Sequence, residues 1–282
     1  MGVSTPLGPG DVRLFCEEKR LECAVDLPGG GELAIFSIRS PGKETPNEDA
    51  AAVIGMPEGG AVLVVADGLG GAPAGHSASR LAVESIEEAL RHARDEGHES
   101  RWGILNGFET ANERVLALGV GAATTLTVAE VSRRSVRAYH VGDSFVLVTG
   151  GRGKTKLQTI PHSPVGYGVE SGLLDEKDAM HHEERHVVSN AIGSGELRID
   201  VGLPLDLAAR DTLLVASDGL SDNLHMAEIV ATVRKGPLVS AARRLAEQAL
   251  HRMRGAEQGG PSKPDDLTFV IFRPRSGGAG RP

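Results

Sequence analysis

Aromatic residues and cysteine are scarce in this sequence, and long apolar runs are absent. Phe, Trp and Tyr make up 3% of its 282 residues, too few for the stacking surfaces that bind single-stranded nucleic acid. The formal net charge of −8 also disfavours nucleic acid and anionic membranes as partners. The two cysteines, Cys16 and Cys23, lack a C-x-x-C spacing, so we expect reduced thiols in a cytoplasmic protein. No apolar stretch approaches the ~20 residues of a membrane span, and the first residues do not resemble a signal peptide.

The hydrophobic pattern alternates between short apolar runs and amphipathic stretches. Apolar runs bounded by turns predict strands at residues 33–37, 50–54, 61–66, 124–131, 136–141, 145–149, 199–204, 211–217 and 267–272. Helical spacing predicts two helix pairs, at 78–93 and 104–116 and at 225–234 and 239–253, the first helix capped by Ser77. The turns between the three strands at 124–149 are too short for a crossover helix, so these strands are expected to form an antiparallel meander.

These elements favour one α+β domain. We place it at residues 31–273, after an N-terminal extension at 1–30 and before a disordered tail at 274–282. Residues 150–188 are polar and weakly periodic, and we expect the 162–186 part to be a mobile lid. This part contains His181, His182 and His186, and a close His pair can mark a zinc site. A solvated loop pair is the simpler interpretation, because no third ligand follows at a matching spacing.

Two of the apolar runs end in the same way. Residues 61–66 lead into Asp67-Gly68-Leu69, and the run at 211–217 leads into Asp218-Gly219-Leu220. A carboxylate at the end of a buried strand is costly unless a cation pairs with it. Two such strand ends can bring two carboxylates towards one point, although Asp-Gly is also a common turn dipeptide.

Further acids border other predicted strands, namely Glu48, Asp49, Asp143, Asp265 and Asp266. Carboxylates suit hard cations such as Mg²⁺ and Mn²⁺ better than zinc. Two such ions about 4 Å apart can share a bridging water and lower its pKa. By residue type alone, a set of unrelated loop acids is an equally good interpretation.

Six motifs occur in a fixed order along the chain. They are Asn47-Glu48-Asp49-Ala50, Val65-Ala66-Asp67-Gly68-Leu69-Gly70-Gly71, Ala123-Thr124-Thr125-Leu126, Val141-Gly142-Asp143-Ser144, Ala216-Ser217-Asp218-Gly219-Leu220-Ser221-Asp222 and Asp265-Asp266-Leu267-Thr268. This series resembles the metal-dependent protein phosphatases, the type 2C serine/threonine family in its compact bacterial form, over roughly residues 33–273. The resemblance implies an αββα sandwich of two antiparallel sheets flanked by helical pairs. It also implies hydrolysis of phosphoserine and phosphothreonine on proteins, without a phosphoenzyme, by a water that bridges two Mg²⁺ or Mn²⁺ ions.

The resemblance also implies a role for each acid. Asp67 bridges the two ions and the Gly68 carbonyl ligates one of them, while Asp218 and Asp265 hold the first ion. Glu48 lies on the second ion, mostly through water, and Asp49 lies behind it. Asp143 matches a residue that helps to bind a weaker third ion in bacterial members, and Asp222 belongs to the same outer site. Asp266 stands where the family often has Asn, a change that should be tolerated.

The chain departs from the family pattern at two positions. Many members place an Arg five positions before the Asp of the first motif, where it binds the substrate phosphate, but here that position is Glu44. We expect Arg39 or Lys43 to contact the phosphate instead, and we favour Arg39 because a guanidinium can bind phosphate in a bidentate manner. The alternative is that both are solvated loop charges. Leu69 replaces the His that animal members carry as a proposed general acid.

Three functions remain open at this stage. The leading one is a protein serine/threonine phosphatase with a signalling role, whose partners are proteins phosphorylated by a serine/threonine kinase. The departure at Glu44 leaves room for a catalytically weak regulatory or binding member of the same fold. A hydrolase of small phosphorylated molecules on the same scaffold is the third.

Overall fold

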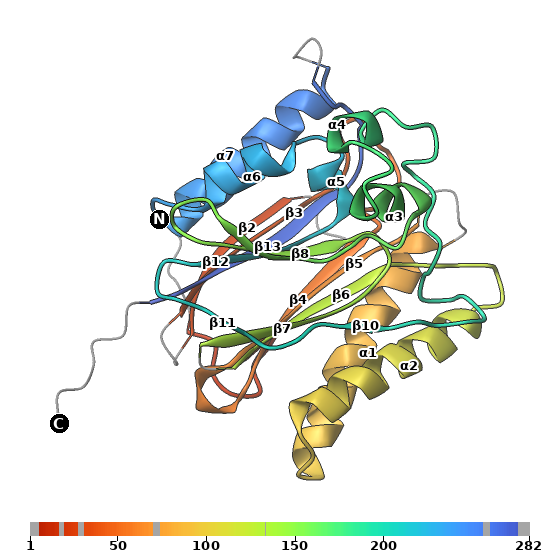
Figure 1. The fold of residues 1–282 in the computed structure, drawn as a ribbon. Helices are drawn as coiled ribbons and strands as arrows, with labels where there is room; N and C mark the ends of the chain where they lie inside the picture. The colour runs from red at the N-terminus through yellow and green to blue at the C-terminus, as the bar shows by residue number, and fades with distance from the viewer. Residues whose placement is uncertain are drawn as a thin grey trace.

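The structure is a computed structural model that describes residues 6–16, 20–27, 31–69, 74–132, 134–255 and 260–275. Two antiparallel sheets pack face to face, and a pair of long helices covers the outer face of each (Figure 1). The predicted α+β class and its αββα sandwich are therefore confirmed. No helix among the described residues is long and apolar enough to cross a membrane.

Strands from both halves of the chain make up each sheet. The seven-stranded sheet contains, in spatial order, β1 (Val12–Cys16), β4 (Asp49–Gly55), β5 (Ala61–Asp67), β6 (Leu126–Ser132), β7 (Ser135–Val141) and β10 (Asp200–Val201), with β11 (Leu205–Asp206) also paired to β7. The six-stranded sheet contains β2 (Arg20–Leu27), β3 (Gly31–Ile38), β13 (Leu267–Pro274), β12 (Thr212–Ala216), β8 (Phe145–Thr149) and β9 (Thr155–Gln158). The first two strands, β1 and β2, are each an outer strand of one sheet, so the predicted N-terminal extension contributes to both. The division into extension, domain and tail stays a prediction, and residues 276–282 of that tail lie outside the described residues.

The helices lie in the predicted pairs. α1 (Gly75–Asp95) and α2 (Ser100–Leu116) cover the seven-stranded sheet, and α6 (Met226–Val233) and α7 (Leu238–Met253) cover the six-stranded sheet. Shorter helices are η1 (Pro57–Gly59), α3 (Pro164–Glu170), α4 (Glu176–Ala179) and α5 (Asp218–Ser221). The prediction that Ser77 caps the first helix is wrong, because α1 already begins at Gly75 after a left-handed Ala74 (φ 61°) and has no side-chain cap.

Buried apolar side chains form three layers, one between the sheets and one beneath each helix pair. Strand β5 shows how one run serves two layers. Ala61, Leu63 and Val65 point between the sheets, whereas Val62, Val64 and Ala66 pack under α1 and α2. Because successive side chains of a strand point to opposite faces, a strand covered on both faces is apolar throughout. This double burial explains the continuous run from residue 61 to 66.

The predicted meander at 124–149 is wrong in its third strand. β6 and β7 pair in the seven-stranded sheet, but β8 pairs with β12 in the other sheet. The chain crosses between the sheets at Gly142, Asp143 and Ser144. Gly142 has φ 104°, and a Cβ there would lie 2.6 Å from Cγ2 of Thr125, so the crossing needs glycine. A turn this short looks like a hairpin in the sequence, yet here it places Asp143 at one end of the sandwich.

A carboxylate centre at one end of the sandwich

Strand ends from both sheets bring the predicted acids together. In the seven-stranded sheet, Asp67 ends β5 and lies opposite Asp49 at the start of β4. In the six-stranded sheet, β12 leads into Asp218 at the start of α5, and Asp265 lies two positions before β13, which pairs with β12. Asp143 comes from the crossing between β7 and β8. We call these five residues, together with Glu48, Asp222 and Asp266, the carboxylate centre.

Hydrogen bonds fix the backbone that carries Asp67. The Asp67 carbonyl accepts from the Thr125 amide and from the Thr124 hydroxyl, each at 2.8 Å. The Asp67 amide donates to Oγ1 of Thr125 at 2.9 Å. The Gly68 amide donates to the Glu48 carbonyl at 3.0 Å, and a Cβ on Gly68 would lie 2.4 Å from the Gly75 carbonyl oxygen. The strand end is therefore rigid, and the close chain approach requires glycine at position 68.

Burial and mutual repulsion raise the pKa of several of these acids. Burial raises the pKa of Asp67 well above its usual value, and the neighbouring charges of Asp49, Asp218, Asp265 and Asp143 add to this. Burial raises the pKa of Asp143 to about 8, with a contribution from Asp218. Like charges that burial forces together favour protonation unless a cation compensates them. A bound divalent ion reverses this balance, so the set of oxygen donors fits Mg²⁺ or Mn²⁺.

One carboxylate oxygen gives a more specific indication of an absent group. Asp49 is 1% exposed, and its Oδ2 accepts a hydrogen bond from Oγ of Ser217 at 2.9 Å. Its Oδ1 is buried and has no hydrogen-bond partner in the described part of the chain. A buried carboxylate oxygen without a donor is costly. Water around an ion in the carboxylate centre supplies such a donor, and this fits the expected place of Asp49 behind the second ion.

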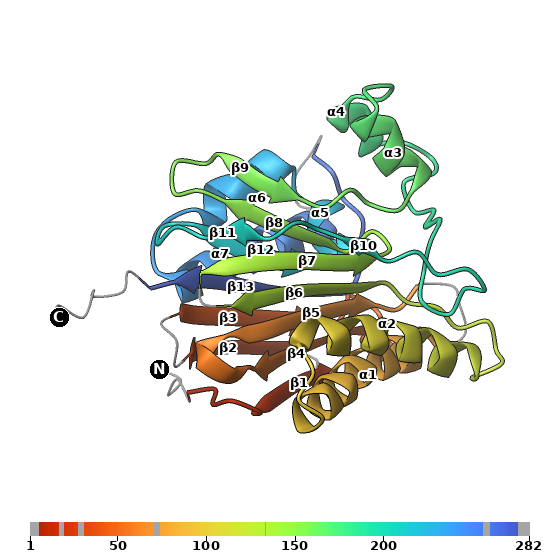
Figure 2. The same cartoon turned by 60° about the horizontal axis from the view of Figure 1, so that its bottom comes forward.

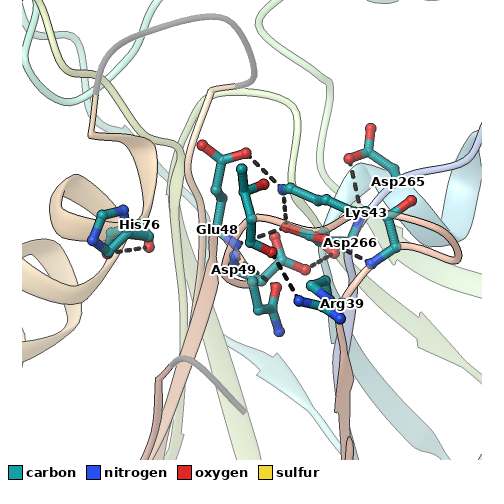
Figure 3. Close-up of polar contacts among 12 residues, drawn as sticks. Arg39, Lys43, Glu48, Asp49, His76, Asp265 and Asp266 are labelled. Carbon is teal, nitrogen blue, oxygen red and sulfur yellow. Dashed lines mark hydrogen bonds and ion pairs between the residues drawn. The ribbon is translucent and has the colours of Figure 1, made fainter. Parts of the chain in front are cut away.

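The loop before β4 brings one of the two predicted phosphate-binding cations to the centre (Figure 3). Nζ of Lys43 lies 2.6 Å from Oε2 of Glu48 and 2.6 Å from Oδ2 of Asp266. In contrast, Nη1 of Arg39 donates to the carbonyls of Glu44 and Thr45, at 3.1 and 3.2 Å, within its own loop. Lys43 therefore lies among the acids, whereas Arg39 braces the loop that carries Lys43.

Asp266, which stands where the family often has Asn, holds this loop in place. It is 3% exposed, and its carboxylate accepts from the amides of Ser40 (2.7 Å) and Glu48 (2.6 Å) as well as from Lys43. Burial lowers the pKa of Lys43, but hydrogen bonds and charge from Asp266 and Glu48 outweigh it and raise the pKa overall. The negative charge of Asp266 thus pairs with the ammonium of Lys43, and an Asn at this position would lack that charge.

Lys263 is a member of the site that the sequence reasoning missed. Its Nζ lies 2.6 Å from Oδ2 of Asp222 and 3.1 Å from Oδ2 of both Asp218 and Asp265. Burial opposes its charge, but the three carboxylates outweigh burial and raise its pKa. A lysine two positions before Asp265 is a visible sequence feature. Its meaning depends on the course of the loop, which the sequence does not reveal.

Several small polar residues of the six motifs also had no assigned role and prove to be structural. Oγ of Ser37 and Oγ1 of Thr268 are 2.8 Å apart, and Nδ2 of Asn47 donates to Ser37 at 3.0 Å. The Thr268 amide donates to Oγ of Ser217 at 3.1 Å, and this hydroxyl in turn donates to Asp49. This buried chain of hydrogen bonds joins the ends of four strands, β3, β4, β12 and β13, and fixes the acids beside them.

A second cluster, His140, His162 and Asp200, lies apart from the carboxylate centre, and its three ligand atoms lie within 4.8 Å of one another. Nδ1 of His162 accepts from the Gly142 amide (3.2 Å) and faces Nδ2 of Asn190 (2.7 Å). With Nδ1 as acceptor, the proton of the neutral ring is assigned to Nε2, which lies 3.1 Å from Oδ2 of Asp200. Nε2 itself is buried and has no partner of hydrogen-bond geometry in the described part of the chain, so the contacts of this cluster to the turn at Gly142 and to Asn190 run through Nδ1. Burial lowers the pKa of His140 to about 4.

The predicted histidine pair of the lid lies elsewhere. His181, His182 and His186 are exposed, and Nδ1 of His182 accepts from the Glu184 amide at 3.1 Å. None of the three belongs to a group of metal-ligating residues within the described ranges. The interpretation as solvated loop residues agrees with this placement.

Comparison with known proteins gives the class to which this fold and site belong. The profile of the protein phosphatase 2C family matches residues 41–253. Over 194 residues the chain is 30% identical to the protein phosphatase PhpP of Streptococcus pneumoniae, a match that covers 66% of this chain and 78% of PhpP. The fold of this chain is similar to that of the PPM Ser-Thr phosphatase MsPP of Mycobacterium smegmatis, whose crystal structure contains cacodylate. The two are 29% identical with a TM-score of 0.69, and the match covers 86% of this chain and 97% of MsPP. A serine/threonine phosphatase of S. agalactiae is also similar (26% identity, TM-score 0.71, 87% and 100%).

The chain therefore belongs to the protein phosphatase 2C family. It is a metal-dependent protein serine/threonine phosphatase that uses Mg²⁺ or Mn²⁺. The resemblance stated from the six motifs is confirmed.

Proposed function

We propose that the carboxylate centre is the active site, and that Asp67, Asp218, Asp265 and Glu48 hold the two ions with which the chain hydrolyses phosphoserine and phosphothreonine in proteins. The observation that carries this proposal is the convergence of half-buried acids from both sheets, where burial and neighbouring carboxylates raise the pKa of Asp67, Asp143 and Asp265. When bound, the two ions lower the pKa of a water and neutralise charge on the phosphate.

The residues around the centre have separate tasks in this proposal. Asp67 would be the shared ligand because β5 holds it between the acids of the two sheets, and Gly68 would offer its carbonyl beside it. Oδ1 of Asp49, which has no donor in the described part of the chain, would accept a hydrogen bond from water. Asp143 adds negative charge on the side of Asp218 and Asp222. None of these groups has to move far, since hydrogen bonds fix the strand ends that carry them.

The function is tested by turnover of phosphoserine and phosphothreonine peptides with and without Mn²⁺. We expect turnover that depends on metal and is lost on chelation. Metal-dependent binding of phosphopeptide without turnover would indicate the catalytically weak alternative. Faster turnover of a nucleotide or a sugar phosphate than of any phosphopeptide would indicate the small-molecule alternative.

The positions of the two loop cations support the opposite order to the one predicted from the sequence, with Lys43 as the stronger candidate for the phosphate contact. With a phosphate dianion held mainly by metal, a lysine at the rim contributes binding more than chemistry. Lys43→Ala is expected to raise KM for phosphopeptide by roughly 5- to 100-fold, as for loss of a ~1–3 kcal/mol hydrogen bond to a charged group, and to change kcat less. Initial rates measure this. They are taken at saturating Mn²⁺, because loss of Lys43 also removes the ion pair of Glu48 and can change the affinity for metal.

Arg39→Ala is the matched control for loss of a loop cation. Since Nη1 of Arg39 contacts backbone carbonyls of its own loop, we expect a smaller rise in KM and a small drop in thermal stability. A larger KM effect for Arg39→Ala than for Lys43→Ala would restore the original assignment of Arg39. Unchanged KM in both variants would mean that metal alone holds the phosphate.

The 162–186 segment borders the active site and is proposed to select protein substrates. α3 and α4 stand at the end of the sandwich near α5 (Figure 2). They border a cleft of ≈ 340 Å³ that also reaches three acids of the carboxylate centre; its lining includes Val165, Met180, Arg185, Asp143, Asp218 and Asp222. A phosphoprotein segment that enters the centre would extend along this cleft.

Replacement of residues 164–179 by a short Gly-Ser linker is expected to change the preference among phosphopeptides. Turnover of p-nitrophenyl phosphate should change less, because this substrate is too small to reach α3 and α4. The ratio of kcat/KM between two phosphopeptides and the aryl phosphate measures the effect. Equal losses for all substrates would show that the segment supports the fold instead of selecting substrates.

The partner is proposed to be a protein phosphorylated by a serine/threonine kinase, because the chain is similar to serine/threonine phosphatases. We propose that the reaction takes place in the cytoplasm. This location rests on the sequence, whose two cysteines have no scaffold spacing.

A further inference from the structure

Lys263 places its ammonium among three acids of the carboxylate centre. Its ammonium contacts one oxygen each of Asp218, Asp222 and Asp265, at 2.6 to 3.1 Å. Asp218 and Asp222 lie one turn apart on α5, where the Asp222 amide donates to the Asp218 carbonyl at 2.7 Å. Residues four apart on a helix share a face, so the two carboxylates point the same way. Asp143 lies close enough for both of them to raise its pKa.

The backbone of Lys263 is fixed at both of its polar groups. Its amide donates to Oδ1 of Asn223 at 2.9 Å, and its carbonyl accepts from Nδ2 of the same residue at 2.8 Å. Asn223 is 0% exposed and also donates to the Gly219 carbonyl, at 2.9 Å. Pro264 follows and restricts the next dihedral angle. Lys263 is thus docked on the same turn that carries Asp218 and Asp222, and its charge remains close to them.

A fixed ammonium at this place acts against a divalent ion at the same place. The ammonium donates to the oxygens that a third ion would ligate, and like charges repel strongly at such short range. An ion held by Asp67, Asp218 and Asp265 would meet this competition too, because the ammonium lies 3.1 Å from Oδ2 of both Asp218 and Asp265. The shortest of the three contacts, 2.6 Å, is to Oδ2 of Asp222, whose charge also raises the pKa of Asp143, so we expect the effect of the lysine to be largest on this outer side.

We propose that Lys263 supplies a tethered positive charge at the outer side of the carboxylate centre in place of a third metal ion, so that this phosphatase operates with two. The proposal rests on the assignment of the centre as the metal site. It gives Lys263 a positioning role: the ammonium holds Asp218 and Asp222 in their orientation and offsets their charge without a metal. The number of bound ions is then a property that a single side chain determines.

Equilibrium dialysis against Mn²⁺, with metal analysis of the retained protein, tests the proposal. We expect two Mn²⁺ per chain in the parent and three in Lys263→Met, with the third ion bound at least tenfold more tightly than any third ion in the parent. Lys263→Arg keeps the charge and should retain two. Asp222→Asn in the Lys263→Met background should return the number to two. Lys154→Met, which removes an exposed charge in the turn after β8, is the matched control and should resemble the parent.

The outcomes separate this proposal from the function on which it rests. Three Mn²⁺ in the parent, or an unchanged two in Lys263→Met, would overturn the role of Lys263 and leave the metal site intact. Tighter binding of the first two ions in Lys263→Met, without a third, would overturn it as well. Fewer than two Mn²⁺ in the parent would overturn the metal assignment and the proposal together. If Lys263→Met does not fold, the number of Mn²⁺ ions bound per chain in Lys263→Gln and in the parent tests the proposal instead.

Discussion

Asp218→Asn and Asp265→Asn are each expected to lower phosphopeptide turnover by at least about 100-fold, more than loss of a residue behind the ligands usually costs. Each substitution removes one negative charge from the proposed first ion but preserves the volume of the side chain. The Asp266 amide, which donates to Oδ1 of Asp265 at 2.9 Å, can still donate to an Asn oxygen. The fold should therefore survive, and the affinity for Mn²⁺ should fall.

Steady-state kinetics, dialysis against Mn²⁺ and thermal unfolding measure these three quantities. Asp95→Asn is the control, since this acid is exposed at the end of α1 and pairs only with the adjacent Arg94 among the described residues. It should leave turnover and metal affinity unchanged. Turnover close to that of the parent in both site variants would exclude a metal centre made from these two acids.

The metal-free protein is expected to lose stability as the pH rises from about 6.5 to about 8.5. The pKa of Asp143 is raised to about 8 in the folded chain, and that of Asp67 is also raised. Between the unfolded and the folded pKa, the folded state binds a proton that the unfolded state lacks. Each such group then costs up to ~1.4 kcal/mol of stability per pH unit. The window begins near pH 6.5 because His140 and His162, whose pKa values are lowered by burial, act in the opposite direction below it.

Metal should reverse this trend. Mn²⁺ at about 100 times its dissociation constant stabilises the folded state by ~2.7 kcal/mol, or roughly 5–10 °C for a chain of this length. The gain should be larger at the higher pH, since metal displaces protons from the acids. Thermal unfolding with Mn²⁺ or with a chelator, at both pH values, measures this. Asp143→Asn should flatten the pH dependence of the metal-free protein. Metal-free stability that increases with pH across this window would contradict the raised pKa values.

The sequence predicted the positions of the acids well because burial determines them. A run such as residues 61–66 can only be a strand covered on both faces, and its end fixes where Asp67 lies. Burial of a run does not tell which of the two sheets the strand joins. The turn at Gly142 to Ser144 is equally short for a hairpin and for a crossing between sheets, so β8 was assigned to the wrong sheet.

The charges that balance the acids were harder to predict than the acids themselves. Lys43 and Lys263 lie in loops, and the contacts of a long side chain depend on the path of the loop backbone. For Lys263 that path is set by a buried Asn223 forty positions earlier, and for Lys43 by Asp266. No local spacing encodes either pairing. The general preference for guanidinium over ammonium favoured Arg39, whereas the course of the loop favours Lys43.

The first two strands protect the two sheets against pairing with strands of other copies of the chain. β1 pairs with β4 and β2 pairs with β3, so a segment of fewer than thirty residues shields one border of each sheet. Without it, β4 and β3 would both present a row of unused amides and carbonyls, to which a strand of another molecule can add. A protein shortened to begin at residue 31 would retain every acid of the carboxylate centre and yet be prone to self-association. The N-terminal segment thus covers a border of each sheet that would otherwise be open to strand addition by another molecule.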